Sequence, residues 1–161
     1  MPRITPMIWF DTQALEAASH YCSIFPNSEI QHVTHYGEPG PGEAGTVMAV
    51  DFVLDGQRMT ALNGGPHVAF TEAISLVVHC GDQEEVDRTW ARLTEGGEER
   101  PCGWLRDRYG VFWQVVPVGF EELLLDPDPA RRDRAVRALY SMKKMDMAAI
   151  QRAVDQAPSR A

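Results

Sequence analysis

The chain has 161 residues, a formal net charge of −8 at pH 7 and an ordinary globular composition, so it is long enough for one domain or for two small modules that share a core. The acidic excess excludes nucleic acid and anionic membranes as expected partners, because basic side chains are what release counterions from phosphates. No stretch approaches the ~20 apolar residues of a membrane span, and the N-terminal apolar run is too short for a signal peptide.

The first half predicts a strand, a helix and three further strands. Residues 4–10 form the first strand, and residues 13–25 form a helix with Leu15, Ala18, Cys22 and Phe25 on one face. Strands at 29–37, 46–56 and 57–63 follow, and the last two are joined by the tight turn Asp55-Gly56. The glycine-rich loop at 37–45 lacks the Lys and Ser/Thr of a phosphate-binding loop, and we expect it to cover a cavity.

The second half repeats this order of elements. A strand at 73–80 precedes a helix at 82–93, in which Asp82 and Glu85 form a capping-box-like start. Strands near 98–102, 104–109 and 111–117 follow. The pattern predicts two βαβββ modules, residues 1–66 and 67–119, and a C-terminal tail at 120–161, together one structural domain.

The tail predicts a pair of short helices. The first starts at Asp128-Pro129, an N-cap followed by proline at the first helical position, and the second starts at Asp146. We expect the basic cluster of Arg131, Arg132 and Arg134 to form a solvated helix face among nearby aspartates.

Few side chains point to catalysis. The three cysteines are odd in number and share no metal-type spacing, which indicates reduced thiols in a cytoplasmic protein; we expect Cys22, Cys80 and Cys102 to be buried small hydrophobes. His79 ends an apolar strand and needs a partner if it is buried. A structural histidine is favoured there, and an acid–base role stays open.

The order of elements and several stretches resemble one superfamily. The stretches are ITPMIWF, AASHYCSIFPNSEI, MTALNGGP, AISLVVHCGDQEEVDRTW, CGWLRDRYGVFWQVVP and YSMKKMDMAAI. They resemble the vicinal oxygen chelate proteins (glyoxalase, bleomycin resistance and dioxygenase), and within them the PhnB-like branch labelled 3-demethylubiquinone-9 3-methyltransferase. The resemblance implies an α+β fold in which two βαβββ modules form curved mixed sheets around a U-shaped cavity, with a C-terminal αα tail, in a homodimer.

The resemblance also implies where a metal would bind. Enzymes of this superfamily hold a divalent metal with one residue from each of four strands, typically histidines and glutamates. Carried over to this chain, the four positions fall on Gln114 and near Pro6, Asn63 and Ser75. Amides are weak ligands and proline has no side-chain donor, so we expect a degenerate site with no metal and no cofactor.

If those positions face the cavity, strand alternation turns their neighbours inward as well. The expected ligand-binding residues are then Ile8, Phe10, Asn63, His79, Phe112 and Gln114, while Trp9, Leu76, Trp113 and Val115 pack under the helices.

Three functions remain in consideration. The first is binding of a small, partly apolar molecule without a metal. The second is a metal-independent enzyme with His79 as acid or base and with Asn63 and Gln114 polarising a carbonyl. A metal-dependent lyase or dioxygenase is a lesser alternative. Methyl transfer is disfavoured, because no glycine fingerprint for S-adenosylmethionine follows the first strand.

Overall fold

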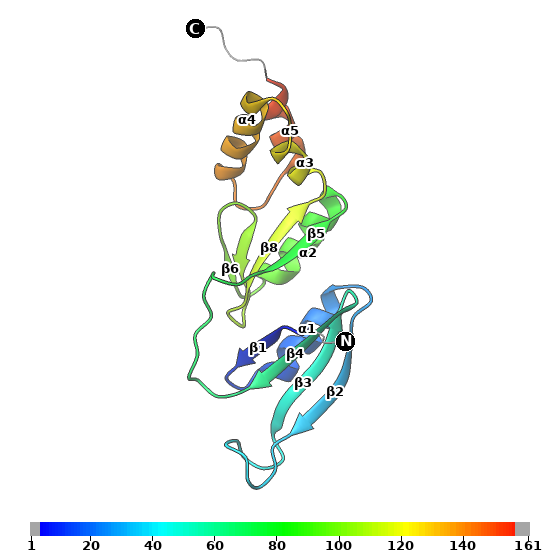
Figure 1. Cartoon of the computed structure of the whole chain (residues 1–161), viewed down its shortest axis with the longest axis vertical. Helices are drawn as coiled ribbons and strands as arrows, with labels where there is room; N and C mark the ends of the chain where they lie inside the picture. Colours follow the sequence, from blue (N-terminus) through cyan, green and yellow to red (C-terminus); the bar gives the residue numbers. More distant parts are fainter. Residues whose placement is uncertain (1–3, 157–161) are drawn as a thin grey trace. The chain divides into compact units, whose positions relative to one another are not determined.

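The computed structural model describes residues 4–156 and contains two compact units, Met1–Ala69 and Phe70–Ala161. Each unit holds one four-stranded mixed sheet with a helix packed on one face (Figure 1). The α+β fold with two βαβββ modules, predicted from the order of elements, is confirmed.

The first unit runs β1 (Met7–Phe10), α1 (Ala14–Ile24), β2 (Glu29–His35), β3 (Val47–Leu54) and β4 (Gln57–Asn63). Its strand order is β1-β4-β3-β2, with β1 parallel to β4 and the other pairs antiparallel. The predicted turn between β3 and β4 is present, with φ of 43° at Asp55 and 80° at Gly56. Positive φ at both central residues matches the twist of an antiparallel hairpin.

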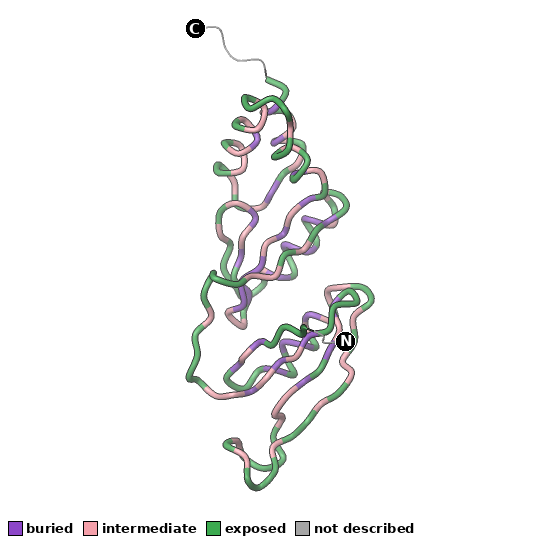
Figure 2. The backbone as a smooth tube through the Cα atoms, viewed as in Figure 1, coloured by how far each residue is buried: buried purple, intermediate pink, exposed green. Residues whose placement is uncertain are grey.

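The second unit runs β5 (Leu76–Cys80), α2 (Gln83–Thr94), β6 (Glu98–Glu99), β7 (Trp104–Arg106) and β8 (Phe112–Pro117). Its order, β5-β8-β7-β6, repeats that of the first sheet, and β5 is again parallel to β8. Along β5 and from Trp113 onward in β8, more buried and less buried positions alternate (Figure 2), as a sheet covered on one face requires.

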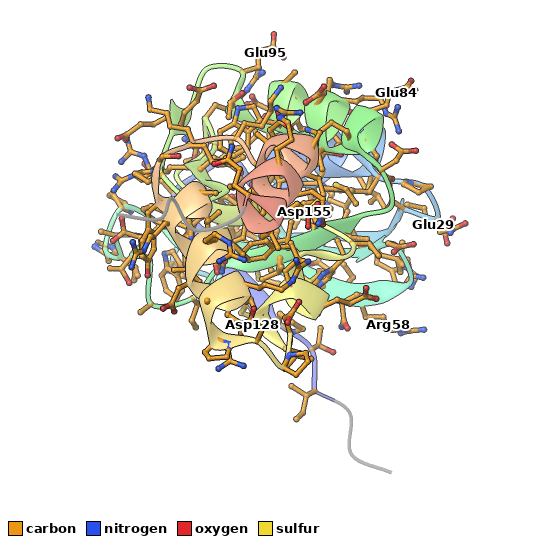
Figure 3. All side chains as sticks on the ribbon, turned by 90° about the horizontal axis from the view of Figure 1, so that it is seen from above. Glu29, Arg58, Glu84, Glu95, Asp128 and Asp155 are labelled. Carbon is orange, nitrogen blue, oxygen red and sulfur yellow. The ribbon has the colours of Figure 1, made fainter. Side chains whose placement is uncertain are left out.

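Helix α2 starts close to the predicted capping box. The Asp82 carboxylate accepts from the Glu85 backbone N–H at 2.8 Å. The Glu85 carboxylate accepts from the Gly81 N–H, whereas a capping box would use the N–H of the next residue, Asp82. Val86, Trp90 and Leu93 bury the sheet-facing side of the helix. Glu84 and Glu95 point outward from its ends (Figure 3).

A buried aspartate organises the β7–β8 hairpin. Asp107 is 3% exposed, and its Oδ1 accepts from the backbone N–H groups of Tyr109 and Val111 at 2.9 Å each. Its Oδ2 accepts from the Trp113 indole N–H at 2.8 Å. One carboxylate therefore closes the turn and holds Trp113 on the helix-covered face of β8.

The tail forms three helices, α3 (Phe120–Leu124), α4 (Pro129–Tyr140) and α5 (Met147–Asp155). The predicted pair, α4 and α5, is present with Asp128 and Asp146 as N-caps, and the short α3 precedes it. A small core joins these helices to the end of β8 through Phe120, Ala135, Met145, Ile150 and Val154, with Val116 packed against them.

The arginines of α4 differ from the expected solvated face. Arg131 pairs with Asp126 at 2.8 Å and Asp155 at 3.2 Å. Arg132 and Arg134 donate to the backbone carbonyls of Asp126 and Val154 at 2.6 and 2.9 Å. The basic cluster therefore joins the tail helices to one another, and Arg134 caps the carbonyl end of α5.

Polar contacts also tie the tail to the second sheet. The Gln83 side chain donates to the Met145 carbonyl and accepts from the Met147 N–H, each at 3.0 Å. The N–H groups of Cys102 and Gly103 donate to the carbonyls of Met142 and Lys143. None of the helices among residues 4–156 combines the length and apolarity that crossing a membrane requires.

We predict that Asp107→Ala destabilises the fold by about 2–4 kcal/mol, because it leaves buried N–H donors without an acceptor. Chemical denaturation followed by circular dichroism measures this. Asp133→Ala is the matched control, since Asp133 is exposed on α4 and its loss should change the free energy of unfolding by less than about 0.5 kcal/mol. Equal effects of the two substitutions would contradict the role of Asp107.

Candidate functional site

The second sheet presents one row of side chains away from α2. Val77 is paired with Gln114 and His79 with Val116, while Trp104 is opposite Gln114 on the other side. The other row, which includes Trp113, Val115 and Cys80, is buried, and Cys80 contacts Thr89 of α2. Trp113 and Val115 thus lie in the buried row, where strand alternation predicts them. Val116, at the end of this row, packs against the core of the tail helices. We call the rest of the row, with Phe112, Gln114, Val77, His79 and Trp104, the open face.

Gln114 lies at the centre of the open face and is bonded to Ser75. Its Nε2 donates to Ser75 Oγ at 2.9 Å, which joins two of the positions at which the resemblance places metal ligands. Within the described chain this is the only hydrogen bond of either side chain. The amide oxygen, the second amide hydrogen and the hydroxyl hydrogen are therefore available to a ligand.

Phe112 lies beside this pair, and the Arg100 side chain covers its ring. It is 5% exposed, and the Arg100 guanidinium lies 5.5 Å from the centroid of its ring. Arg100 is held by Glu72 at 2.7 Å and Glu98 at 3.4 Å. A cation over an aromatic ring at this distance is attractive, so this end of the face is both apolar and ordered.

His79 shares the face but not the hydrogen-bonded pair. It lies two residues beyond Val77 along β5, which places it about 7 Å further along the strand. Its side chain is 53% exposed, and its Nδ1 lies 3.9 Å from the Glu121 carboxylate of α3. The structure does not bring His79 into contact with Gln114.

The first sheet has the opposite orientation to the one expected. Ile8, Phe10 and Asn63 lie in the row covered by α1, and Trp9 lies in the uncovered row. Asn63 accepts from the Ala14 N–H at the start of α1 at 2.8 Å and donates to the Val47 carbonyl at 3.1 Å. The predicted inward orientation of these three residues is wrong, because Asn63 serves the helix start.

The four carried-over positions do not fit a transition metal. Asn63 uses its amide for the backbone, Gln114 and Ser75 bond each other, and Pro6 offers no side-chain donor. Among residues 4–156, no three His, Cys, Asp or Glu side chains are grouped closely enough to hold a metal ion. Imidazole, carboxylate or thiolate donors are what such metals select, and this set supplies none.

Two of the three thiols lie in unreactive surroundings. All three cysteines are free, and Cys80 is fully buried. Burial raises the pKa of the Cys80 thiol, and burial also raises the pKa of Cys22. A raised pKa lowers the thiolate fraction at neutral pH, so neither group has the environment of a nucleophile.

A cavity of about 610 Å³ lies at the end of β4 in the first unit. The loop between β2 and β3, expected to cover a cavity, does line this one. Of its polar lining residues, only Asn63 was expected to bind a ligand, and the loop was the other signal in the sequence. Its lining includes Asp11, Tyr36, Glu43 and His67.

Comparisons with known proteins support the fold. A family model described as 3-demethylubiquinone-9 3-methyltransferase matches residues 2–116, so α3 to α5 lie outside the match. The PhnB protein of Bacillus cereus is 35% identical with a TM-score of 0.67, over 73% of this chain and 100% of that chain. No curated protein matches the chain significantly.

Two more distant structures share the fold alone. Protein PA1353 from Pseudomonas aeruginosa is 21% identical with a TM-score of 0.61, over 73% of this chain and 98% of that chain. The fosfomycin resistance protein FosX from Listeria monocytogenes, solved with manganese(II) and sulfate, is 15% identical with a TM-score of 0.54, over 76% of this chain and 97% of that chain.

We predict that manganese(II) or zinc(II) does not stabilise this protein. A metal at a hundred times its dissociation constant would add about 2.7 kcal/mol and raise the melting temperature by several degrees. Differential scanning fluorimetry with each metal and with EDTA checks this, and we expect a shift below about 1 °C. Stoichiometric manganese, zinc, nickel or iron in the purified protein, measured by elemental analysis, would contradict the prediction.

Proposed function

Because this chain belongs to the PhnB-like 3-demethylubiquinone-9 3-methyltransferase family of the vicinal oxygen chelate superfamily, we propose that it binds a small, partly apolar molecule without using a metal. The observation that carries the proposal is the Gln114–Ser75 hydrogen bond on the open face. A relative with this fold, FosX, has been solved with manganese(II). In this chain, the positions at which the resemblance places two metal ligands fall on or near Gln114 and Ser75, an amide and a hydroxyl.

The pair favours a ligand with an amide-like edge. Gln114 offers an acceptor and a donor side by side, and Ser75 adds a hydroxyl donor. Val77, Trp104 and Phe112 surround the pair with apolar and aromatic surface. A planar carbonyl-and-amide group attached to an aromatic body therefore matches both components of the face.

Methyl transfer does not form part of the proposal. The description of the family names a methyltransferase. In this chain, however, the first strand is followed by Asp11-Thr12-Gln13-Ala14, which lead into α1. This segment lacks the glycines that bring a backbone close to a nucleotide-like cofactor.

Acid–base catalysis is a second candidate, favoured by one observation. The Glu121 carboxylate lies 3.9 Å from His79 Nδ1, and a carboxylate at this place would orient an imidazole. His79 lies on the same face as Gln114, so a substrate held there would extend toward it. The two candidates differ in what loss of His79 does.

We predict that Gln114→Ala and Ser75→Ala each weaken ligand binding about 5- to 30-fold, because a hydrogen bond contributes about 1–2 kcal/mol. Benzamide is a minimal probe, and titration followed by protein NMR measures its affinity. Gln57→Ala is the matched control, since Gln57 is exposed at the start of β4. Unchanged affinity in both site variants would contradict the proposal.

His79→Ala is the second control in that experiment. If the protein is a binding module, benzamide affinity changes less than twofold. Acid–base catalysis requires instead that His79→Ala abolishes turnover of any substrate while leaving its binding intact. Loss of both together would remove the support for catalysis.

We propose further that the uncovered sheet faces pair with a second copy of the chain. Met7 is 61% exposed and Val77 46% exposed on those faces, and exposed apolar side chains on a sheet face favour burial against a partner. Such pairing would enclose a bound ligand. This makes the homodimer the functional form.

We predict that Met7→Asp shifts the protein from dimer to monomer, because it places a charge in an apolar interface. Sedimentation equilibrium measures the dissociation constant. Val118→Asp is the matched control, since Val118 is 60% exposed and lies outside the strands. A wild-type protein that stays monomeric at every concentration would contradict the homodimer.

A further inference from the structure

The cavity in the first unit is lined by none of the residues of the open face. Its volume is about 610 Å³, within the usual range for small-molecule sites. It shares no residue with the Gln114–Ser75 pair, and we call it the Asp11–Glu43 cavity. Its lining comes from the end of β1, the β2–β3 loop and the end of β4: Asp11, Thr12, Tyr36, Pro41, Gly42, Glu43, Thr46, Val47, Asn63, Gly64, Gly65, Pro66 and His67.

One wall is the β2–β3 loop, which wraps around Tyr36. The Tyr36 hydroxyl donates to the Asn63 carbonyl at 2.6 Å, which fastens the loop to the end of β4. A Cβ at Gly42 would lie 2.3 Å from the Tyr36 ring, so only glycine lets the loop pass this close. The wall is therefore built around a fixed aromatic ring.

A second wall, at the end of β4, is fastened as well. The Trp9 indole donates to the Gly65 carbonyl at 2.9 Å, and the Gly65 N–H donates to the Asp11 carbonyl at 3.3 Å. A Cβ at Gly64 would lie 2.2 Å from the Trp9 ring. Both walls are thus held by hydrogen bonds, and a ligand would find the cavity formed in advance.

The charge of the cavity is negative and uncompensated. Asp11 and Glu43 line it, and in the described chain neither carboxylate has an ion pair or a side-chain hydrogen bond. Residues 4–69 contain seven Asp and Glu side chains against one arginine, Arg58, which does not line the cavity. Both carboxylates are solvent-exposed, so their negative charge is available to a cationic ligand.

The shape favours an organic cation over a metal ion. Asp11, Glu43 and His67 line the same cavity, yet no three such side chains in residues 4–156 are grouped closely enough for a metal. Tyr36, Pro41, Val47 and Pro66 add apolar surface. Carboxylates spread around an apolar wall fit an ammonium group on a small apolar body.

We propose that the Asp11–Glu43 cavity is a second binding site that takes small organic amines. The ammonium group is held by Asp11 and Glu43, and the apolar part of the amine packs on Tyr36 and Pro66. Tyr36 acts as a positioning residue, because its hydroxyl fixes the loop that carries Glu43.

Three probes with the same ring and different head groups test the chemistry: phenethylamine, 2-phenylethanol and phenylacetate. Titrations of the full chain are followed by NMR through the indole N–H signal of Trp9, which is bonded to the cavity wall. We expect phenethylamine to bind at least tenfold more tightly than the alcohol, phenylacetate not to bind, and amine affinity to fall with added salt. Equal binding of amine and alcohol, or no binding of the amine, would overturn the proposal.

Conservative variants test the residues. Asp11→Asn and Glu43→Gln should each weaken phenethylamine binding at least fivefold without changing the melting temperature. Glu38→Gln is the matched control, because Glu38 lies in the same loop and does not line the cavity, and Gln114→Ala should also leave amine binding unchanged. Tyr36→Phe should weaken amine binding while the preference for amine over alcohol remains. Equal losses in Glu38→Gln and Glu43→Gln would show general charge attraction and overturn the site.

Discussion

Each sheet of this protein is covered by a single helix, so every strand residue belongs either to a buried row or to an uncovered row. A shift of one residue would exchange the two rows completely. In the second unit, Asp107 fixes the rows by holding the Trp113 indole at 2.8 Å in the buried row. In the first unit, Asn63 does so by accepting from Ala14 N–H at the start of α1. Two buried polar side chains thus decide which residues are left for a ligand.

The second unit was predictable from its sequence because polarity marks its rows. Gln114 interrupts an apolar strand, and a polar side chain in only one row identifies that row as the uncovered one. The first unit gives no such mark. Met7 and Trp9 in one row are as apolar as Ile8 and Phe10 in the other. Asn63 then misleads, because its amide is satisfied by backbone groups inside the buried row. Alternation shows which residues share a row. When a buried polar side chain is paired with backbone groups, however, its polarity can make the covered row look like the uncovered one.

Side-chain to backbone contacts between residues far apart in the sequence account for the other features in which the structure differs from the sequence-based expectations. Arg134 finds the carbonyl of Val154 and Arg132 that of Asp126, so arginines that resemble a solvated face hold helices together. Tyr36 likewise reaches the Asn63 carbonyl, 27 residues away in sequence, and so fastens the loop beside the cavity. Composition and periodicity carry no information about such partners. The helices and strands were therefore predictable, whereas the cavity was indicated only by Asn63 and the loop, both of which line it.

The amide at position 114 changes what the open face can recognise. A glutamate there would accept the Ser75 hydroxyl hydrogen, and both of its oxygens would remain acceptors, the arrangement that suits a cation. Gln114 instead donates to Ser75 Oγ at 2.9 Å. The hydroxyl hydrogen then stays free, and the amide keeps one acceptor and one donor for a ligand. Because the pair carries no charge, its selectivity comes from the direction of its hydrogen bonds. Uncompensated carboxylates occur instead in the Asp11–Glu43 cavity, so of the two proposed sites one would recognise a neutral group and the other a charged group.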